Sequence, residues 1–255
     1  MSGPGAPGGR LRGVIFDVDG TLVDSERHGH RVAFNQAFAE LGLPDHWDED
    51  LYGELLVVTG GQRRIDGWLA RRGVDEAERT RLAAALHARK TAIFNDLVLA
   101  GRVPLRSGVA RLLSELARAG VRLAVATTGS RSWVEPLLAA VAGRARFEAV
   151  VTGDDVTERK PDPEAFVLVL ERLGLPAVAA VAVEDSANGL RAAQSAGLAC
   201  AVVVNGYTAH DDVARADLVL DGFGGPEERA RVLADPHATG CRGVVDTATL
   251  EALLR

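Results

Sequence analysis

The sequence predicts an α/β protein in which a Rossmann-like core domain with a parallel sheet is interrupted by an all-helical insert. After Pro104, short apolar segments alternate with segments of helical periodicity, which is the pattern of β-α-β units. In residues 26–101, apolar residues instead recur at helical spacing. This change follows directly after one short apolar segment, residues 12–16, so the insert is predicted to leave the sheet behind its first strand.

The first predicted strand, residues 12–16, ends abruptly at an acidic segment. A helix is predicted for residues 26–41, and Gly42 ends it. A second, long helix is predicted to begin at Asp75 and to end near Gly101. The expected division of the chain is a disordered tail at residues 1–10, a core at residues 11–25 and 102–255, and a helical insert at residues 26–101.

Beyond Pro104, the predicted elements alternate regularly. Helices are predicted at residues 108–119, 133–141, 163–173 and 186–196. Strands are predicted at residues 121–126, 147–151, 179–183, 200–204 and 218–220. A terminal helix packed on the core is expected within residues 222–255, whose role stays open. Because open α/β sheets bind ligands at the carboxyl ends of their strands, the residues that follow these strands are candidates for a site.

The composition of the 255-residue chain excludes several classes of partner. Hydrophobic residues make up 47% and charged residues 25% of it, as in ordinary packed proteins. The net charge of -6 argues against nucleic acid as a partner. The sequence has neither the apolar run of a membrane span nor that of a signal peptide. Cys200 and Cys241 are expected to be free, buried thiols in a reducing compartment, so we expect a cytoplasmic protein; its oligomeric state stays open, with a monomer favoured.

Chemically active side chains follow four of the predicted strands. In chain order they are Asp17 and Asp19, Thr127 and Thr128, Lys160, and Glu184 and Asp185. The carboxyl ends of parallel strands meet at one edge of a sheet, so these side chains are expected to lie together. Chance accounts easily for one such placement, but stability alone does not explain all four.

The types of these residues predict phosphoryl transfer. Asp17, Asp19 and Asp185 form a set of hard oxygen ligands suited to Mg²⁺, and without a cation they would raise each other's pKa values. Lys160 and Mg²⁺ can neutralise phosphoryl oxygens, to which the Thr127 hydroxyl can donate. A carboxylate can attack phosphorus to form an aspartyl phosphate, and a second one can protonate the leaving oxygen. The expected partner is therefore a small phosphorylated metabolite.

Each of these residues, taken singly, also has a structural interpretation. An Asp-x-Asp-Gly segment is most often a turn. Thr127 can cap a helix, and Lys160 can be a solvated loop charge. Glu184 and Asp185 can stabilise the start of a helix through its dipole. For Glu184, the roles of a second metal ligand and of a residue that orients other groups both stay open.

The four segments resemble the four motifs of the haloacid dehalogenase-like hydrolase superfamily. The matching residues are Asp17-Val18-Asp19-Gly20-Thr21, Thr127 after a strand, Lys160-Pro161 and Glu184-Asp185. The helical insert resembles the cap domain of subfamily I in this superfamily. The resemblance covers residues 12–204 and implies an enzyme with Asp17 as nucleophile, Asp19 as general acid and base, and Mg²⁺ as cofactor. It further implies that Asp19 reaches the metal through its backbone carbonyl.

A closer resemblance is to the CbbY-like sugar-phosphate phosphatases. It rests on residues 26–35, 51–56, 59–65 and 123–128 and implies hydrolysis of xylulose 1,5-bisphosphate. The substrate-binding residues that it implies are Glu26, His30, Gly60, Gly61, Arg64 and Thr128. A turn at Gly60 and a purely structural His30 are the alternatives. Gln62 departs from the family, which usually has Lys there; either Arg63 compensates for the lost charge or the substrate carries a single phosphate.

Three functions are compatible with the sequence. The first is a Mg²⁺-dependent phosphatase. The second is a phosphomutase similar to β-phosphoglucomutase, which differs in how long the aspartyl phosphate survives against water, and the sequence does not decide between the two. The third, from another class, is a non-catalytic metabolite sensor. A sensor does not need a nucleophile, an acid, metal ligands and a phosphate-binding lysine together, so we expect an enzyme, with the phosphatase as the first hypothesis.

Overall fold

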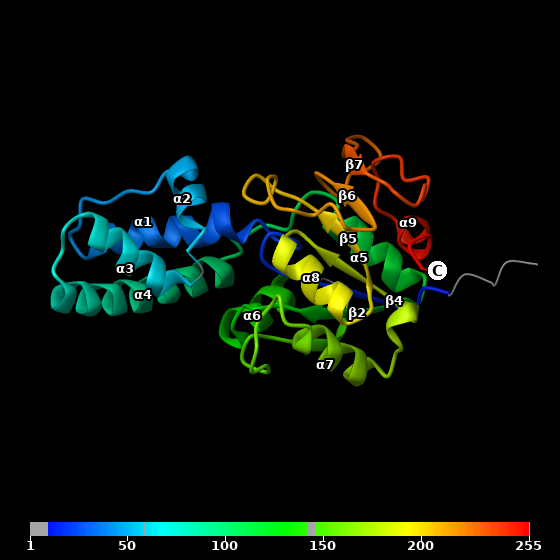
Figure 1. Ribbon diagram of the computed structural model, residues 1–255, viewed down its shortest axis with the longest axis horizontal. Coiled ribbons are helices and arrows are strands. Elements are labelled where there is room, and N and C mark those ends of the chain that lie inside the picture. Colours follow the sequence, from blue (N-terminus) through cyan, green and yellow to red (C-terminus); the bar gives the residue numbers. More distant parts are fainter. Residues whose placement is uncertain (1–9, 59, 142–145, 255) are drawn as a thin grey trace, which may run out of the picture. The chain divides into compact units, whose positions relative to one another are not determined.

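The structure is a computed structural model that describes residues 10–58, 60–141 and 146–254. The chain divides into two compact units, Met1–Val23 with Leu105–Arg255, called the core here, and Asp24–Pro104, called the cap (Figure 1). The sequence predicts these boundaries at residues 25/26 and 101/102. The predicted disordered tail falls, except for its last residue, outside the described residues.

The core is built on one sheet, to which the described residues contribute seven strands in the order β3-β2-β1-β4-β5-β6-β7. The strands are β1 (Gly13–Phe16), β2 (Arg122–Ala126), β3 (Phe147–Val151), β4 (Ala180–Glu184), β5 (Ala199–Val203), β6 (Leu218–Leu220) and β7 (Val232–Ala234). Strands β1 to β6 pair in parallel, whereas β7 pairs antiparallel with β6. The predicted α/β class is confirmed. Strand β7, which has three residues and is largely exposed, was not predicted.

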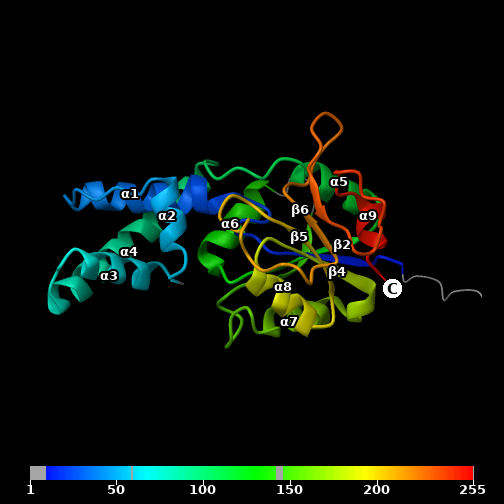
Figure 2. The ribbon, with the colours of Figure 1, turned by 45° about the horizontal axis from the view of Figure 1, so that its top comes forward.

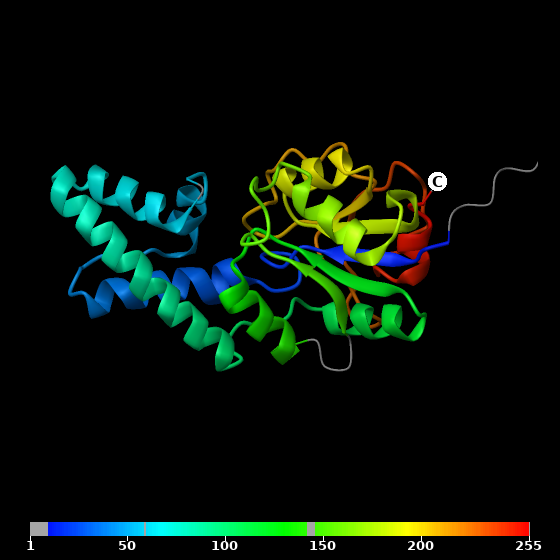
Figure 3. The ribbon, with the colours of Figure 1, turned by 90° about the horizontal axis from the view of Figure 1, so that it is seen from below.

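Helices cover both faces of this sheet, which is why its central strands are apolar except at their ends. They are α5 (Val109–Arg118), α6 (Arg131–Val141), α7 (Glu164–Leu173), the 3-10 turn η2 (Ala177–Ala179), α8 (Ala187–Ser195) and α9 (Thr247–Glu251). Helices α7 and α8 pack on the face that carries Ile15, Ala124 and Ala182. Figures 2 and 3 show these two helices on one side of the sheet and α5 on the other.

The register of the sheet sets the position of the first acidic residue. Phe16 of β1 is level with Val125 of β2 and with Val183 of β4. The next residue, Asp17, therefore lies between the last residues of the two neighbouring strands. This geometry follows from the parallel pairing alone and brings the segments after β1, β2 and β4 to one edge.

The predicted terminal helix corresponds to α9, whose Leu250 is buried. Both cysteines are free, as predicted. Cys200 is buried in β5, but the prediction of a buried thiol is wrong for Cys241, which is only partly buried. The reason is that Cys241 lies in an irregular segment outside the sheet and not in a core strand.

All described elements of the cap are helical. They are η1 (Glu26–His30), α1 (Arg31–Glu40), α2 (Glu49–Leu55), α3 (Gly61–Arg71) and α4 (Glu76–Leu99). The predicted helix over residues 26–41 is thus a π-helical turn followed by α1. No helix in the described ranges is long and apolar enough to span a membrane.

Aromatic side chains form the interior of the cap. Phe34, Phe38, Trp47 and Tyr52 are buried, and Trp47 contacts each of the other three. Asn35 accepts a hydrogen bond from the Trp47 amide and donates one to the Trp47 carbonyl, both at 2.8 Å. This pair of bonds satisfies the backbone of an irregular segment that would otherwise bury unpaired polar groups.

Candidate active site

Asp17 is the first residue after β1. Its amide still donates to the Val183 carbonyl of β4 at 3.0 Å, so its backbone is held by the sheet. The residue is 6% exposed. Burial raises the pKa of its carboxyl group, the Lys160 ammonium opposes this rise, and the nearby Asp19 adds to it. A rigid, buried carboxylate beside a cation is suited to act as a nucleophile.

The segment after Asp17 is a tight turn, as the structural interpretation of the Asp-x-Asp-Gly segment predicts. The amides of Thr21 and Leu22 donate to the Val18 carbonyl. Gly20 has a φ of 80°, and a Cβ atom there would lie 2.2 Å from the Asp185 Oδ2 atom. Only glycine fits this position, because it both tolerates the positive φ and allows the Asp185 carboxylate to approach.

Lys160 is buried in this edge of the sheet and is not a solvated loop charge. Its side chain is 5% exposed. Its ammonium group donates to Asp17 Oδ1 at 2.7 Å, to Glu184 Oε1 at 2.5 Å and to the Ala126 carbonyl at 2.8 Å. Burial opposes the charge on Lys160, but Asp17 and Glu184 outweigh burial and raise the pKa of the ammonium group. All three ammonium protons thus have acceptors.

Glu184 is the last residue of β4, and both of its carboxylate oxygens have donors. Oε1 accepts from Lys160, and Oε2 accepts from the Asp185 amide at 3.2 Å. Burial raises the pKa of Glu184, Lys160 lowers it and Asp17 raises it, which brings it to about 7. A Cβ atom on Gly189 would lie 1.9 Å from Oε2, so α8 approaches this carboxylate only because it carries glycine there.

The acidic pair does not belong to the first turn of α8. Ser186 is the N-cap residue of α8, and its hydroxyl accepts from the Gly189 amide at 3.1 Å. Glu184 and Asp185 precede this cap, so stabilisation of the helix dipole does not explain them.

Three carboxylates lie close together beside a single ammonium group. Oxygens of Asp17, Glu184 and Asp185 all lie within 4.8 Å of one another. Burial, followed by Asp17 and Glu184, raises the pKa of Asp185 well above its usual value. Such mutual destabilisation is relieved by a cation, so the donor set fits a divalent metal. The predicted metal set differs from this cluster, because it contains Asp19 in place of Glu184.

Asp19 is half-buried and pairs through its backbone with Val23. Among the described residues, its carboxylate is not part of the acidic cluster. The expected role of this side chain in proton transfer and the expected metal contact through the Asp19 carbonyl both stay predictions.

Thr127 and Thr128 follow β2 on the same edge. Thr127 is 1% exposed, and its hydroxyl accepts from the Gly129 amide at 3.1 Å. This bond closes a turn ahead of α6 and is not an N-cap bond, since α6 begins at Arg131. While it accepts this bond, the hydroxyl can still donate its proton to a phosphate oxygen. Thr128 is partly buried.

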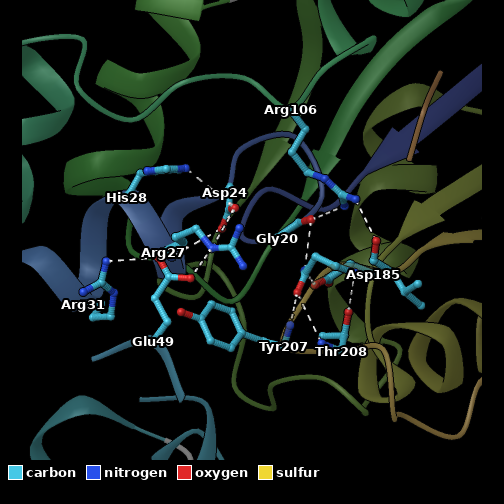
Figure 4. A network of polar contacts seen from close by, with 12 residues as sticks. Gly20, Asp24, Arg27, His28, Arg31, Glu49, Arg106, Asp185, Tyr207 and Thr208 are labelled. Atoms are coloured by element: carbon cyan, nitrogen blue, oxygen red, sulfur yellow. Dashed lines mark hydrogen bonds and ion pairs between the residues drawn. The ribbon is translucent and has the colours of Figure 1, made fainter. Parts of the chain in front are cut away.

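Two residues that support this edge were not predicted. Arg106 donates to the carbonyls of Gly20 at 2.5 Å, Val203 at 2.7 Å and Val204 at 2.7 Å. Asn205 donates to Asp185 Oδ2 at 2.7 Å. Figure 4 shows the contacts around Gly20, Asp185 and Arg106. Asn205 follows β5, so the strand-end rule could have found it; the partners of Arg106 are backbone atoms, which no sequence pattern reveals.

In the cap, the predicted residues Glu26 and Arg64 share one partner. The Tyr52 hydroxyl donates to Glu26 Oε2 at 2.5 Å and accepts from Arg64 Nη1 at 3.2 Å. Arg64 is buried and also donates to the Leu55 carbonyl at 3.0 Å. Glu26 and Arg64 are therefore held in place by Tyr52, which was not predicted as a site residue.

His30 lies against a second buried cation of the cap. Its Nδ1 atom is 2.9 Å from the Lys90 ammonium nitrogen, and its ring packs on Phe94 with centroids 3.9 Å apart. Burial, followed by the charge of Lys90, lowers the pKa of His30 to about 3. The imidazole is therefore neutral at physiological pH, and Nδ1 accepts the bond from Lys90.

Gly60 and Gly61 begin α3, with Gly60 as its N-cap at a φ of 95°. A Cβ atom on Gly61 would lie 3.0 Å from the His87 ring and 3.3 Å from Phe34, so the helix start packs closely on its neighbours. Gln62 and the neighbouring Arg63 are exposed on the first turn. The cap thus groups Glu26, His30 and Arg64 around buried partners and carries the glycine pair at a helix start.

Replacing His30 by Gln is expected to remove part of the acid sensitivity of folding. The folded pKa of about 3 lies below the usual value of 6.5. Between these values the unfolded chain binds a proton that the folded chain does not, so the free energy of unfolding falls as the pH falls through this window. Urea denaturation at about pH 7 and about pH 5 measures this loss. It should be smaller in His30→Gln than in the wild type, with the exposed His28→Gln as control; equal losses would contradict a buried neutral imidazole.

Known proteins are similar to this chain in sequence and in fold over most of its length. The family model for haloacid dehalogenase-like hydrolases matches residues 11–197. Protein CbbY of Cereibacter sphaeroides is 46% identical over 216 residues, which are 84% of this chain and 93% of that protein. A CBBY-like protein of Arabidopsis thaliana is 42% identical over 229 residues, 87% of this chain and 72% of the relative. A crystal structure of a CbbY mutant from Rhodobacter sphaeroides, in complex with xylulose-(1,5)bisphosphate, matches this chain with a TM-score of 0.71. The two sequences are 44% identical, and the match covers 85% of this chain and 98% of the crystallised chain.

These similarities extend over most of the chain and show the family to which it belongs. The chain belongs to the haloacid dehalogenase-like hydrolase family. Its identity to CbbY proteins over most of its length places it among the CbbY-like members of that family. Both resemblances predicted from the sequence are confirmed.

Proposed function

We propose that this chain is a Mg²⁺-dependent phosphatase that hydrolyses a sugar phosphate, xylulose 1,5-bisphosphate, through an aspartyl phosphate on Asp17. The observation that carries the proposal is the buried cluster in which Lys160 bridges Asp17 and Glu184 beside Asp185. The CbbY relative crystallised with xylulose-(1,5)bisphosphate supports the substrate.

The reaction begins with attack of an Asp17 oxygen on phosphorus. The P–O bond to the sugar breaks, and Asp19 donates a proton to the leaving sugar oxygen. The deprotonated Asp19 then accepts a proton from water, whose oxygen attacks the phosphorus of the aspartyl phosphate. The P–O bond to Asp17 breaks, inorganic phosphate leaves, and both carboxyl groups return to their initial states. Sheet hydrogen bonding at Asp17 fixes the direction of the nucleophile.

The metal set that we propose is Asp17, Asp185 and the Asp19 carbonyl. When bound, Mg²⁺ neutralises the phosphoryl oxygens in the transition state. Glu184 is assigned a different role, because Lys160 and the Asp185 amide already occupy its two oxygens. It orients Lys160, whose charge opposes the rise that burial causes in the pKa of Asp17. Thr127 donates to a phosphate oxygen through its hydroxyl.

Sugar recognition is assigned to the cap. Glu26 and Arg64 are held by Tyr52, and His30 is neutral, so this group offers both acceptors and donors to a polyol phosphate. Gly60, Gly61 and Thr128 complete the expected set of substrate contacts. Gln62 carries no charge at a position where the family usually has Lys.

Replacing Gln62 by Lys is expected to lower the KM for a bisphosphate by about tenfold and to leave that for a monophosphate nearly unchanged. The added ammonium supplies a charge-assisted bond to the second phosphate, an interaction in the range of 1.5–3 kcal/mol, and such gains correspond to about tenfold or more. Steady-state kinetics with xylulose 1,5-bisphosphate and with a pentulose monophosphate measure the two KM values. Arg81→Gln, on an exposed face of α4, is the control. An equal change in both KM values would contradict a role at the second phosphate.

The experiment that tests the proposed function is a phosphate-release screen over sugar monophosphates and bisphosphates with Mg²⁺. Xylulose 1,5-bisphosphate is expected to give the highest kcat/KM, and omission of the metal should abolish release. β-Glucose 1-phosphate belongs in the screen, because its conversion into glucose 6-phosphate without phosphate release would identify a mutase. Tight binding without any turnover would identify a sensor; either result would overturn the proposal.

A further inference from the structure

Asn205, the second residue after β5, has an amide group whose orientation is fixed by its surroundings. Its Oδ1 atom accepts from the amides of Tyr207 at 2.8 Å and Thr208 at 3.2 Å. The backbone N–H of Asn205 donates to the Thr208 hydroxyl oxygen at 3.0 Å. An amide oxygen held by two N–H groups leaves only one orientation, in which the NH₂ group points the other way.

The NH₂ group of Asn205 points to the acidic cluster. It donates to Asp185 Oδ2 at 2.7 Å and to the Gly20 carbonyl at 3.3 Å. Figure 4 shows Gly20, Asp185 and Thr208 within one network of polar contacts. The position is crowded, since a Cβ atom on Gly20 would lie 2.7 Å from the Asn205 nitrogen and 2.2 Å from Asp185 Oδ2. Three segments, those after β1, β4 and β5, are therefore joined at one nitrogen atom.

Asn205 binds one oxygen of Asp185, Oδ2, and Asp185 contributes a carboxylate oxygen to the cluster with Asp17 and Glu184. A hydrogen bond to one oxygen of a carboxylate fixes the plane of the group and thereby the directions of both of its oxygens.

We infer that Asn205 is a positioning residue that orients Asp185 for binding of the divalent cation. The inference rests on the proposed function insofar as that function assigns the metal to Asp185. Groups that orient metal ligands typically change metal affinity by about 10–100-fold when they are removed. Asn205 never touches the reacting atoms, so its loss weakens metal binding and leaves the chemistry with bound metal intact.

The test compares Asn205→Ala and Asn205→Ser with the wild-type protein by calorimetric titration with Mn²⁺. Both variants lose the donor to Asp185, but serine retains an acceptor that can close the turn with the amides of Tyr207 and Thr208. The dissociation constant is expected to rise by about 10–100-fold in both variants. Asn188→Ala, an exposed asparagine on α8, is the matched control and should bind as the wild type does. Circular dichroism checks the fold.

A wild-type Mn²⁺ affinity in Asn205→Ser would overturn the inference, because metal binding would then depend on the turn and not on the donor to Asp185. The Asn205→Ser variant decides this even if Asn205→Ala fails to fold. In activity assays, the half-saturating Mg²⁺ concentration should rise by the same factor, with the rate at saturating Mg²⁺ within about twofold of the wild type. A lower saturated rate at unchanged metal affinity would also contradict a positioning role. The Mn²⁺ titration stands independently of turnover, so failure of the proposed phosphatase activity and failure of this inference are separate results.

Discussion

Replacing Asp17 by Asn is expected to reduce phosphate release from xylulose 1,5-bisphosphate by about 10⁴-fold or more. A carboxamide oxygen does not form the aspartyl phosphate, so the variant loses the intermediate and not merely a binding contact. The fold should persist, because Asn has nearly the same volume and Lys160 retains Glu184 and the Ala126 carbonyl as acceptors. A coupled assay of inorganic phosphate, together with circular dichroism, measures both outcomes.

Asp50→Asn is the matched control for this substitution. Asp50 is an exposed carboxylate on α2, and its variant should retain wild-type turnover. Release by Asp17→Asn within about tenfold of the wild type would contradict covalent catalysis, since loss of an attacking group costs far more.

Replacing Lys160 by Met in the metal-free protein is expected to lower the free energy of unfolding by about 3 kcal/mol or more. Lys160 is the ammonium group that compensates the buried carboxylates of Asp17 and Glu184, and methionine fills its volume without its charge. Denaturant unfolding measures the loss. Excess Mg²⁺ should restore more stability to this variant than to the wild type, because the cation replaces the missing charge.

The pH dependence of the Lys160→Met variant follows from the direction of the pKa shifts. Glu184 has a raised pKa of about 7 even with Lys160 present, and loss of the ammonium raises it further. The folded state then binds a proton that the unfolded state has released, so stability falls as the pH rises from the ordinary pKa of 4.5 through about 7 and above. Arg81→Met is the control, since its ion pair with Glu78 is exposed and screened by solvent and so contributes little to stability. If Lys160→Met and Arg81→Met lost the same free energy of unfolding, this result would contradict the burial of Lys160 among the carboxylates.

The sequence predicted which residues meet at the carboxyl ends of the strands better than it predicted the residues that support them, and the reason lies in the sheet. Asp17, Thr127, Lys160 and Asp185 were found because each follows a strand whose apolar run is visible, and parallel strands bring their ends together. The assignment of strands and helices in the core was possible because buried elements have a clear period.

The supporting residues were hidden because their partners are distant in sequence or belong to the backbone. Arg106 binds carbonyls of residues 20, 203 and 204, and Lys90 meets His30 across two helices of the cap. Nothing in the local sequence encodes such contacts, which depend on tertiary packing. The carboxylate cluster also contains Glu184, whose side chain becomes a member only because Gly189 leaves room for it.

The central claim is the covalent intermediate on Asp17, and the most direct measurement is its chemical capture. Acid quenching during turnover of xylulose 1,5-bisphosphate, followed by reduction with borohydride and peptide mass spectrometry, converts an aspartyl phosphate into homoserine. The mechanism predicts homoserine at position 17 in the wild type and none in Asp17→Asn. Steady phosphate release with an unmodified Asp17, or with the modification at Asp19, would contradict it.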